Sequence, residues 1–261
     1  MTRVLSGTIL LAFAVAVVWL SPAAVFFGVA ELLLVLGFVE YAALARNSGL
    51  PVPAIPAAAA AMLTCAAVAG GLPAPIDAVL MTALVALGAL TLTAWNGGRD
   101  ALGLAAASLF PSLYLGLPLG AMIVIRETRG RHALFLLMLT VVVSDTAQYY
   151  SGRAFGRRPL APKVSPKKTV EGAFGGLVAG AILLVVAGAW WLPAVPIALR
   201  VMLGVTIVAL GITGDLFESM LKRSAGMKDS SSLIPGHGGI LDRIDALLFA
   251  APVYYVVLKY I

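Results

Sequence analysis

Acidic and basic side chains gather near the end of the chain, in the stretch 214–245. Asp215 and Glu218 close one apolar segment, and a second carboxylate pair, Asp242 and Asp245, opens the next. A spacing of three residues places both carboxylates of a pair on one face of a helix. If the two helix ends meet, several oxygen ligands gather at one point, which suits Mg²⁺ bound to substrate phosphates. The stretch predicts a cation site for phosphoryl chemistry, with juxtamembrane ion pairs as the alternative.

A glycine-rich run, Pro-Gly-His-Gly-Gly at 235–239, lies between these two helices and includes Gly238 and Gly239. Glycines at this density let backbone N–H groups approach an anion closely. His237 alone is weak evidence for catalysis, because an ordinary loop histidine with satisfied hydrogen bonds is the simpler explanation. The run as a whole favours an anion site over plain surface ion pairs.

A second group of candidate residues lies around the sixth apolar segment and the polar stretch that follows it. Asp145 stands within that segment, where an ionisable side chain is costly and marks a functional site by default. Lys167 and Lys168 stand just before a glycine-rich helix start, with hydroxyl side chains on either side at Ser165 and Thr169. This arrangement suits a bound phosphate. The nearby arginines have a simpler alternative, because cytoplasmic loops are enriched in basic residues without any ligand.

Several other chemistries are excluded by the motifs that the sequence lacks. There is no Gly-x-Ser-x-Gly elbow, no Gly-Lys dipeptide for a Walker A loop and no His-Glu-x-x-His zinc motif. No Asp-Gly or Asp-Asp dipeptide occurs, which argues against alcohol phosphotransferases and aspartate-rich prenyltransferases. One cysteine, Cys65, cannot form an internal disulfide, and two histidines are too few for a histidine-based metal cage.

The composition indicates the setting in which these residues must work. Of 261 residues, 61% are apolar and only 11% are charged, and the mean hydropathy is +1.01. Soluble domains carry about 25% charged residues, so this chain is predicted to be an integral membrane protein. The net charge of +6 favours basic cytoplasmic loops, anionic lipid or an anionic substrate such as a nucleotide.

Nine apolar segments divide the chain, and we expect an all-α polytopic helical bundle of about nine transmembrane helices. They run roughly over 5–20, 22–45, 53–72, 76–95, 101–125, 132–152, 172–192, 195–216 and 241–260. The first also has features of a cleavable signal peptide, but another apolar stretch follows at once, which favours a first span.

Two long polar loops, 153–171 and 217–240, are expected to carry the function. We therefore divide the chain into scaffold helices over 1–130 and a catalytic membrane region over 131–261. Basic residues are more numerous on the side of the two loops, which predicts that side to be cytoplasmic. The basic connection 126–131 argues against this orientation. We expect a multi-pass protein of the cell (inner or plasma) membrane with its active site facing the cytoplasm.

The stretch from Ser219 to Asp245 resembles the signature of the phosphatidate cytidylyltransferases, also called CDP-diacylglycerol synthases. Ser, Lys-Arg, Lys-Asp, Pro-x-His-Gly-Gly and Asp-Arg-x-Asp stand at the family's spacings, without a gap. The stretch 144–172 resembles the family's other block and departs from it at Gln148 and Val170, where a small residue and Trp are usual. Neither departure changes a charge. The resemblance covers about residues 140–261.

The resemblance implies transfer of CMP from CTP to phosphatidate, giving CDP-diacylglycerol and pyrophosphate for phospholipid synthesis. It implies Mg²⁺, with room for a second cation, on Asp215, Asp242 and Asp245. The residues implied to carry the reaction are Asp145, Lys167, Lys168, Lys222, Arg223, His237 and Arg243. The residues implied to bind the substrates are Ser165, Thr169, Ser219, Lys228, Asp229, Gly238 and Gly239. The expected partners are CTP, phosphatidate and membrane lipid, without nucleic acid, and a homodimer is left open.

Two alternative functions fit part of the same pattern. Another membrane enzyme that uses CTP, such as a polyprenol kinase, would need similar phosphate-binding charges. A transporter with an ionic site at the membrane midplane would suit Asp145 and the Gly- and Pro-interrupted segments, but it predicts charges within spans in both halves of the chain. Here the charges cluster in the second half.

Overall fold

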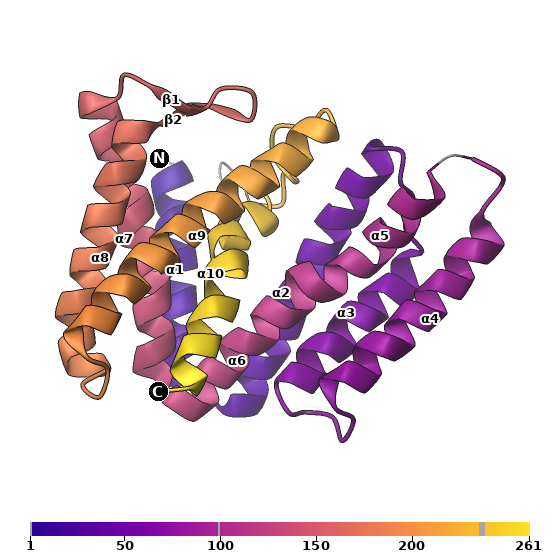
Figure 1. The fold of residues 1–261 in the computed structure, drawn as a ribbon, viewed down its shortest axis with the longest axis horizontal. Coiled ribbons are helices and arrows are strands. Elements are labelled where there is room, and N and C mark those ends of the chain that lie inside the picture. The colour runs from indigo at the N-terminus through magenta and orange to yellow at the C-terminus, as the bar shows by residue number, and fades with distance from the viewer. Residues whose placement is uncertain (1, 99, 235–237) are drawn as a thin grey trace. The chain divides into compact units, whose positions relative to one another are not determined.

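The computed structural model describes residues 2–98, 100–234 and 238–261, and helices dominate this part of the chain (Figure 1). The helices are α1 (Thr2–Leu20), α2 (Ala23–Asn47), α3 (Ala54–Val68), α4 (Ile76–Ala94), α5 (Ala101–Pro111), the π-helical turn η1 (Ser112–Gly116), α6 (Leu117–Arg129), α7 (Arg131–Phe155), α8 (Val170–Trp191), α9 (Ile197–Ser224) and α10 (Leu241–Lys259). Two short antiparallel strands, β1 (Pro159–Ala161) and β2 (Ser165–Thr169), form a hairpin between α7 and α8.

Each predicted apolar segment coincides with a helix or, for 101–125, with the continuous run from α5 to α6, so the all-α fold class is confirmed. Within the described residues, six helical runs are long and apolar enough to cross a membrane: Ala23–Asn47, Ile76–Thr93, Ala101–Arg129, Arg131–Phe155, Val170–Trp191 and Ile197–Ser224. Shorter apolar helices occur at Gly7–Leu20 and Ala54–Val68, and α10 begins with charged residues. The count of nine spans stays a prediction.

Prolines mark the starts of three helices in the first half of the chain. Pro22, Pro53 and Pro75 precede α2, α3 and α4, each in an extended backbone conformation. Proline has no N–H to leave unpaired at a helix start, and it cannot continue a helix that precedes it. At the break between α6 and α7, Gly130 has φ +88°, a conformation that favours glycine.

A proline also explains the π-helical turn. Pro111 lies within the run from α5 to α6, where it has no N–H to donate and its ring displaces the preceding turn. The carbonyl four residues earlier, at Ala107, instead accepts a hydrogen bond of 2.8 Å from the Tyr41 hydroxyl on α2. The π-helical turn follows directly after Pro111.

The described chain forms two compact units, and the first comprises residues 1–124 and 221–243. Within it, α3 contacts α2, α4, α5 and η1. Glycines allow this close packing: a Cβ on Gly116 would lie 2.6 Å from the Ala61 carbonyl oxygen, and one on Gly120 would lie 2.9 Å from that of Cys65. Small residues four apart let apolar helices approach closely. The division predicted at residue 130 concerns function and stays a prediction.

The second unit comprises residues 125–220 and 244–261. Its α7 and α8 pack side by side, and the hairpin extends from their adjoining ends (Figure 1). Glycines of α8 allow this contact: a Cβ on Gly176 would lie 3.0 Å from the Ser144 carbonyl oxygen, and one on Gly180 would lie 3.3 Å from the Ser144 Cβ. The packing holds the two ends of the hairpin at a defined separation.

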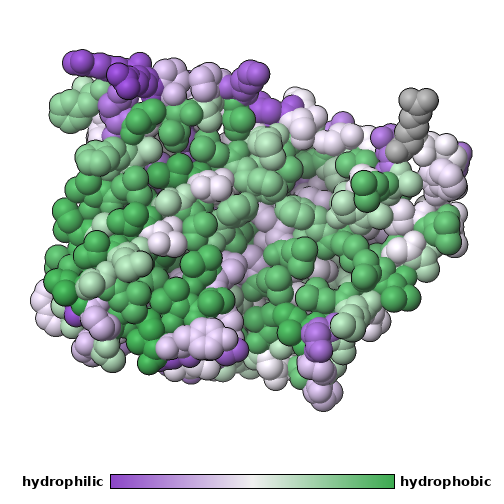
Figure 2. All heavy atoms as spheres, in the orientation of Figure 1, coloured by the Kyte–Doolittle hydropathy of each residue, from purple (hydrophilic) through white to green (hydrophobic). Residues whose placement is uncertain are grey.

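The opposite side of α8 is apolar and exposed. Its exposed large side chains are spaced by four residues: Phe174, Val178, Ile182, Val186 and Trp190. Figure 2 shows hydrophobic side chains along α8 and α9, and hydrophilic ones where the hairpin lies. An uninterrupted apolar stripe of this length is what a helix presents to lipid.

The second predicted loop begins later than expected. The prediction placed a loop over 217–240, but α9 continues to Ser224, so this boundary is wrong. Residues 217–224 are mostly good helix formers, and the helix ends where Gly226 adopts φ +69° and its N–H bonds to the Arg223 carbonyl. Ser219, Lys222 and Arg223 are therefore positioned by a helix.

Candidate active site

In the second unit, the hairpin reaches α9 through an ion pair. Lys168, on β2, donates from Nζ to Asp215 Oδ2 at 2.5 Å, and both side chains are partly exposed. Ser219, one turn further along α9, donates to Asp215 Oδ1 at 3.4 Å. The structure therefore brings together residues from both predicted stretches, which are 47 positions apart in the sequence.

Asp245 adds a buried carboxylate to this group. The negative charges of Asp215, Glu218 and Asp145 act on it, and its Oδ1 accepts a hydrogen bond of 2.7 Å from the Ala246 N–H. It lies there because α9 and α10 are in close contact: a Cβ on Gly214 would be 2.5 Å from the Asp245 carbonyl oxygen. We name Asp145, Asp215, Glu218 and Asp245, with Lys168, the carboxylate–lysine cluster.

The cluster has the donor chemistry that a divalent cation requires. Carboxylate oxygens are the ligands Mg²⁺ prefers, and like charges near one another favour a bound cation. Among the described residues, however, no three His, Cys, Asp or Glu side chains form a ready-made metal site.

In the first unit, Asp242 forms a second ion pair, with Lys222 of α9. Both side chains are more than nine-tenths buried. Asp242 Oδ2 also accepts the N–H of Ser230 at 3.0 Å, the Ser230 hydroxyl at 2.8 Å and the N–H of Gly239 at 2.8 Å. Each oxygen of Asp242 therefore already has a donor within the chain.

The glycines of the predicted anion loop are needed for this arrangement. Gly238 has φ +76°, and a Cβ there would lie 2.5 Å from Asp242 Oδ2. The N–H of Gly239 does approach an anion closely, as predicted, but that anion is the Asp242 carboxylate. Pro235, Gly236 and His237 lie outside the described residues.

Other predicted residues have local roles or exposed positions. Thr169 Oγ1 accepts the Gly172 N–H at 3.1 Å and caps the N-terminus of α8. Asp145 Oδ1 accepts a hydrogen bond of 2.9 Å from Gln148. Ser165 is half-buried on β2, and the exposed residues are Asp145, Lys167, Arg223, Lys228, Asp229 and Arg243. Arg223 donates to the Met227 carbonyl oxygen at 3.1 Å.

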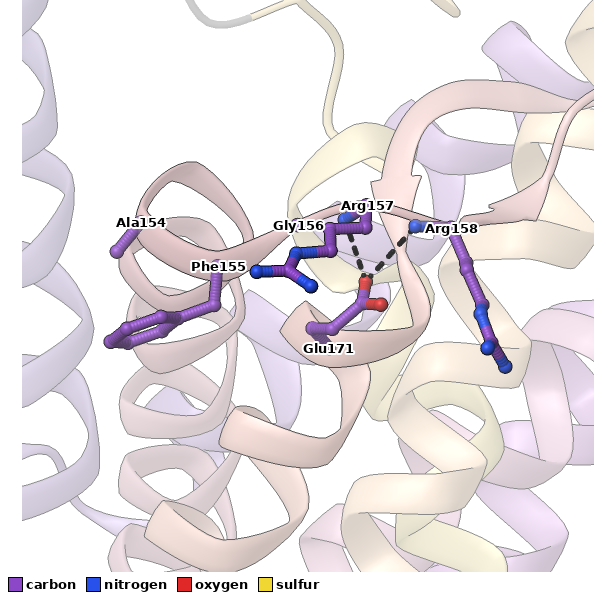
Figure 3. Close-up of a pocket in the computed structure, with 6 residues that line it drawn as sticks. All are labelled: Ala154, Phe155, Gly156, Arg157, Arg158 and Glu171. Atoms are coloured by element: carbon purple, nitrogen blue, oxygen red, sulfur yellow. Dashed lines mark hydrogen bonds between the residues drawn. The ribbon is translucent and has the colours of Figure 1, made fainter.

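A cavity of about 390 Å³ lies beside the end of α7 (Figure 3). Glu171 accepts hydrogen bonds from the backbone N–H groups of Arg157, at 3.0 Å, and Arg158, at 3.2 Å. In Figure 3 the Arg157 guanidinium extends between Phe155 and Glu171, while that of Arg158 points away. The cavity is therefore lined by an exposed aromatic ring, two arginines and one carboxylate.

Glu40 is the functional candidate that the sequence prediction missed. It lies on α2, in the half of the chain predicted as scaffold, and it is 4% exposed. Its carboxylate accepts hydrogen bonds from the loop and helix start around Gly239. The same signal that marked Asp145, an ionisable side chain within an apolar span, was present at Glu40.

The fold defines an all-α protein with several helices long and apolar enough to cross a membrane, and its charged clusters join residues of different helices. The chain belongs to the cytidylyltransferase family, whose sequence pattern matches residues 1–261. The family resemblance predicted from the two motifs is thereby confirmed.

Curated relatives in three bacteria carry the name phosphatidate cytidylyltransferase. The protein of Haemophilus influenzae is 47% identical over 130 residues, which are 47% of this chain and 45% of the relative. Those of Aquifex aeolicus and Pseudomonas aeruginosa are 40% identical over 151 residues and 38% identical over 165 residues. These matches cover 58% and 63% of this chain and 56% and 59% of the relatives. The chain thus spans about half the length of the curated relatives it matches.

Proposed function

We propose that the protein transfers CMP from CTP to phosphatidate, giving CDP-diacylglycerol and pyrophosphate. The observation that carries this proposal is the carboxylate–lysine cluster, in which β2, α7, α9 and α10 gather both halves of the motif pattern. The family match and the names of the relatives support it.

In this reaction a lipid phosphate oxygen attacks the α-phosphorus of CTP. The new P–O bond forms as the bond to the bridging oxygen breaks, and pyrophosphate leaves with the electron pair. No side chain needs to act as a nucleophile, so positioning and charge stabilisation account for most of the rate. Lys168 would bind phosphate oxygens, since its partly exposed ammonium group lies beside Asp215, a proposed cation ligand.

Asp215 and Asp245 would hold Mg²⁺, which supplies positive charge that polarises the α-phosphorus. Asp242 stays a proposed ligand, but it would have to give up its donor Lys222. The proposed phosphate-binding cations also include Lys167, Lys222, Arg223 and Arg243. We propose that the cavity beside Arg157 takes the phosphate of the lipid, with its acyl chains in the bilayer.

The decisive experiment follows the label of CTP in the purified full chain with phosphatidate vesicles and Mg²⁺. We expect label from the α-phosphate to appear in lipid and label from the γ-phosphate in pyrophosphate. Polyprenol and diacylglycerol are tested as alternative acceptors. Transfer of the γ-phosphate to either lipid, with release of CDP, would make the enzyme a kinase. EDTA should abolish turnover, and added Mg²⁺ should restore it; turnover unchanged by EDTA would refute the metal role.

A further inference from the structure

The carboxylate of Glu40 is fully engaged with a distant part of the chain. Oε1 accepts the hydroxyl of Ser231 at 2.7 Å and the N–H of Ile240 at 2.9 Å. Oε2 accepts the hydroxyl of Ser230 at 2.8 Å and the N–H of Leu241 at 2.9 Å. Each oxygen therefore lies within hydrogen-bond distance of two groups, from residues about 190 to 201 positions away in the sequence.

These four groups come from two places between α9 and α10. Ser230 and Ser231 lie in the connection that follows α9, and Ile240 and Leu241 stand at the start of α10. Backbone N–H groups in the first turn of a helix have no partner within that helix, and a carboxylate there also interacts favourably with the helix dipole. Glu40 thus joins the two serines to the start of α10.

A serine connects Glu40 to the Asp242–Lys222 ion pair. The Ser230 hydroxyl oxygen lies 2.8 Å from Glu40 Oε2 and 2.8 Å from Asp242 Oδ2, and its single proton serves one carboxylate at a time. The packing around it is tight, because a Cβ on Gly239 would lie 2.2 Å from the Ser230 hydroxyl oxygen and 2.3 Å from Glu40 Oε2. A shift of Glu40 would therefore be transmitted to Ser230, Gly239 and Asp242.

We propose that Glu40 is a positioning residue for the CMP transfer: it holds the Gly239–Leu241 backbone and, through Ser230, the Asp242–Lys222 pair. This inference rests on the proposed function and adds to it a residue from the first half of the chain. A carboxylate within an apolar helix is costly, and packing alone would be served by an apolar side chain. The backbone N–H groups of Ile240 and Leu241 require an acceptor, one on each oxygen, which a carboxylate provides.

The test compares Glu40→Gln with Glu31→Gln. Glutamine keeps the shape but turns one acceptor into an N–H donor, which would face two of the four loop donors. Glu31 is a matched control, because it is a buried carboxylate on the same helix whose oxygens accept no hydrogen bond among the described residues. We expect Glu40→Gln to lower kcat about 30-fold with KM changed less than threefold, because misplaced groups act mainly on the transition state. Glu31→Gln should stay within twofold of wild type in kcat.

A second measurement does not depend on turnover. Hydrogen exchange of the amides of Ile240 and Leu241 should accelerate at least tenfold in Glu40→Gln and stay unchanged in Glu31→Gln. Unchanged exchange in Glu40→Gln would refute the proposal that Glu40 holds the Ile240 and Leu241 amides. Faster exchange with kcat within twofold of wild type would refute the positioning role. If the wild-type chain lacked CMP transfer altogether, the proposed function would fail, and the exchange result would still decide whether Glu40 holds the loop.

The serine provides a variant that removes no buried carboxylate. Ser230→Ala should also lower kcat, by about tenfold. The kcat of the double variant should be little lower than that of Glu40→Gln alone, because both substitutions break the same hydrogen-bond network. Fully multiplicative losses would show that Glu40 acts independently of Ser230, and would overturn that part of the proposal. Should Glu40→Gln fail to fold, Ser230→Ala with the exchange measurement tests the same connection.

Discussion

At the scale of single residues, two of the carboxylates that were predicted to bind a metal cation form ion pairs with lysines. Lys168 pairs with Asp215, and Lys222 pairs with Asp242. Phosphate oxygens are strong acceptors for ammonium groups, so an arriving triphosphate would compete for the same lysines. If a lysine exchanged its carboxylate partner for a phosphate, that carboxylate could bind a divalent cation. The ion pairs thus fit a site that is completed by its substrate.

Replacement of Lys168 by methionine tests this role at one residue. We expect Lys168→Met to lower kcat/KM about 100-fold, because a charge acting on the transition state is removed. Thermal stability in detergent should change little, since a partly exposed ion pair contributes only about 0–1 kcal/mol. The measurement is labelled-CTP turnover beside a melting curve.

Lys163 serves as the control for Lys168→Met. It lies exposed in the turn of the same hairpin, outside the predicted site. Lys163→Met should retain wild-type turnover. A folded Lys168→Met protein with near wild-type turnover would remove Lys168 from the active site.

At the scale of elements, the close approach of α9 and α10 in the second unit brings Asp215 near Asp245. Gly214 permits this approach, because its missing side chain leaves room for the Asp245 carbonyl oxygen. The glycines of α8 serve the packing on α7 in the same way, and thereby hold the hairpin with Lys168. Small residues at helix contacts are therefore part of how the site is built.

An alanine at Gly214 should separate the two carboxylates. Its Cβ would lie 2.5 Å from a backbone oxygen, so the helices must shift. Overpacking of this kind costs about 1–3 kcal/mol, and we expect a melting temperature several degrees lower and about tenfold lower turnover.

Gly28→Ala is the matched helix substitution on α2. A Cβ at Gly28 would have no neighbour within 4 Å. Alanine is the better helix former by about 1 kcal/mol, so this variant should melt at the same or a higher temperature. A Gly214→Ala protein as stable and active as wild type would show that the contact between α9 and α10 does not position the site.

At the scale of the whole molecule, the membrane decides which side the polar segments occupy. The hairpin and the segment 225–240 are separated by α8 and α9, which are both long and apolar enough to cross a bilayer. Two crossings return the chain to the side from which it left. The hairpin and this segment should therefore lie on one face, and the distribution of basic residues predicts the cytoplasmic one.

Single cysteines test this topology after Cys65→Ala. Lys163→Cys and Ser232→Cys are both at exposed positions, one in the hairpin turn and one in the 225–240 segment. A membrane-impermeant thiol reagent should label both only after the inner face is opened. Labelling of both in intact cells would reverse the predicted orientation, and labelling of one alone would mean that α8 and α9 do not both cross the membrane.

The amino-acid pattern was enough to predict the helices and the family. Long apolar segments must become helices in lipid, because only a helix satisfies its own backbone there, and prolines and glycines mark where those helices end. The spacing of Lys, Asp and Gly in the two motifs was enough to predict the family. Such patterns are local, so they can be read without knowing how the chain packs.

Which of these residues come into contact became visible in the folded chain. Glu40 and Ser230 are 190 positions apart, and Lys168 and Asp215 are 47 apart, so no helical periodicity relates them. The structure also showed that the Gly239 N–H binds Asp242 and that α9 reaches Ser224. These outcomes depend on which helix faces pack together, and close packing is decided by side-chain shapes from distant parts of the chain.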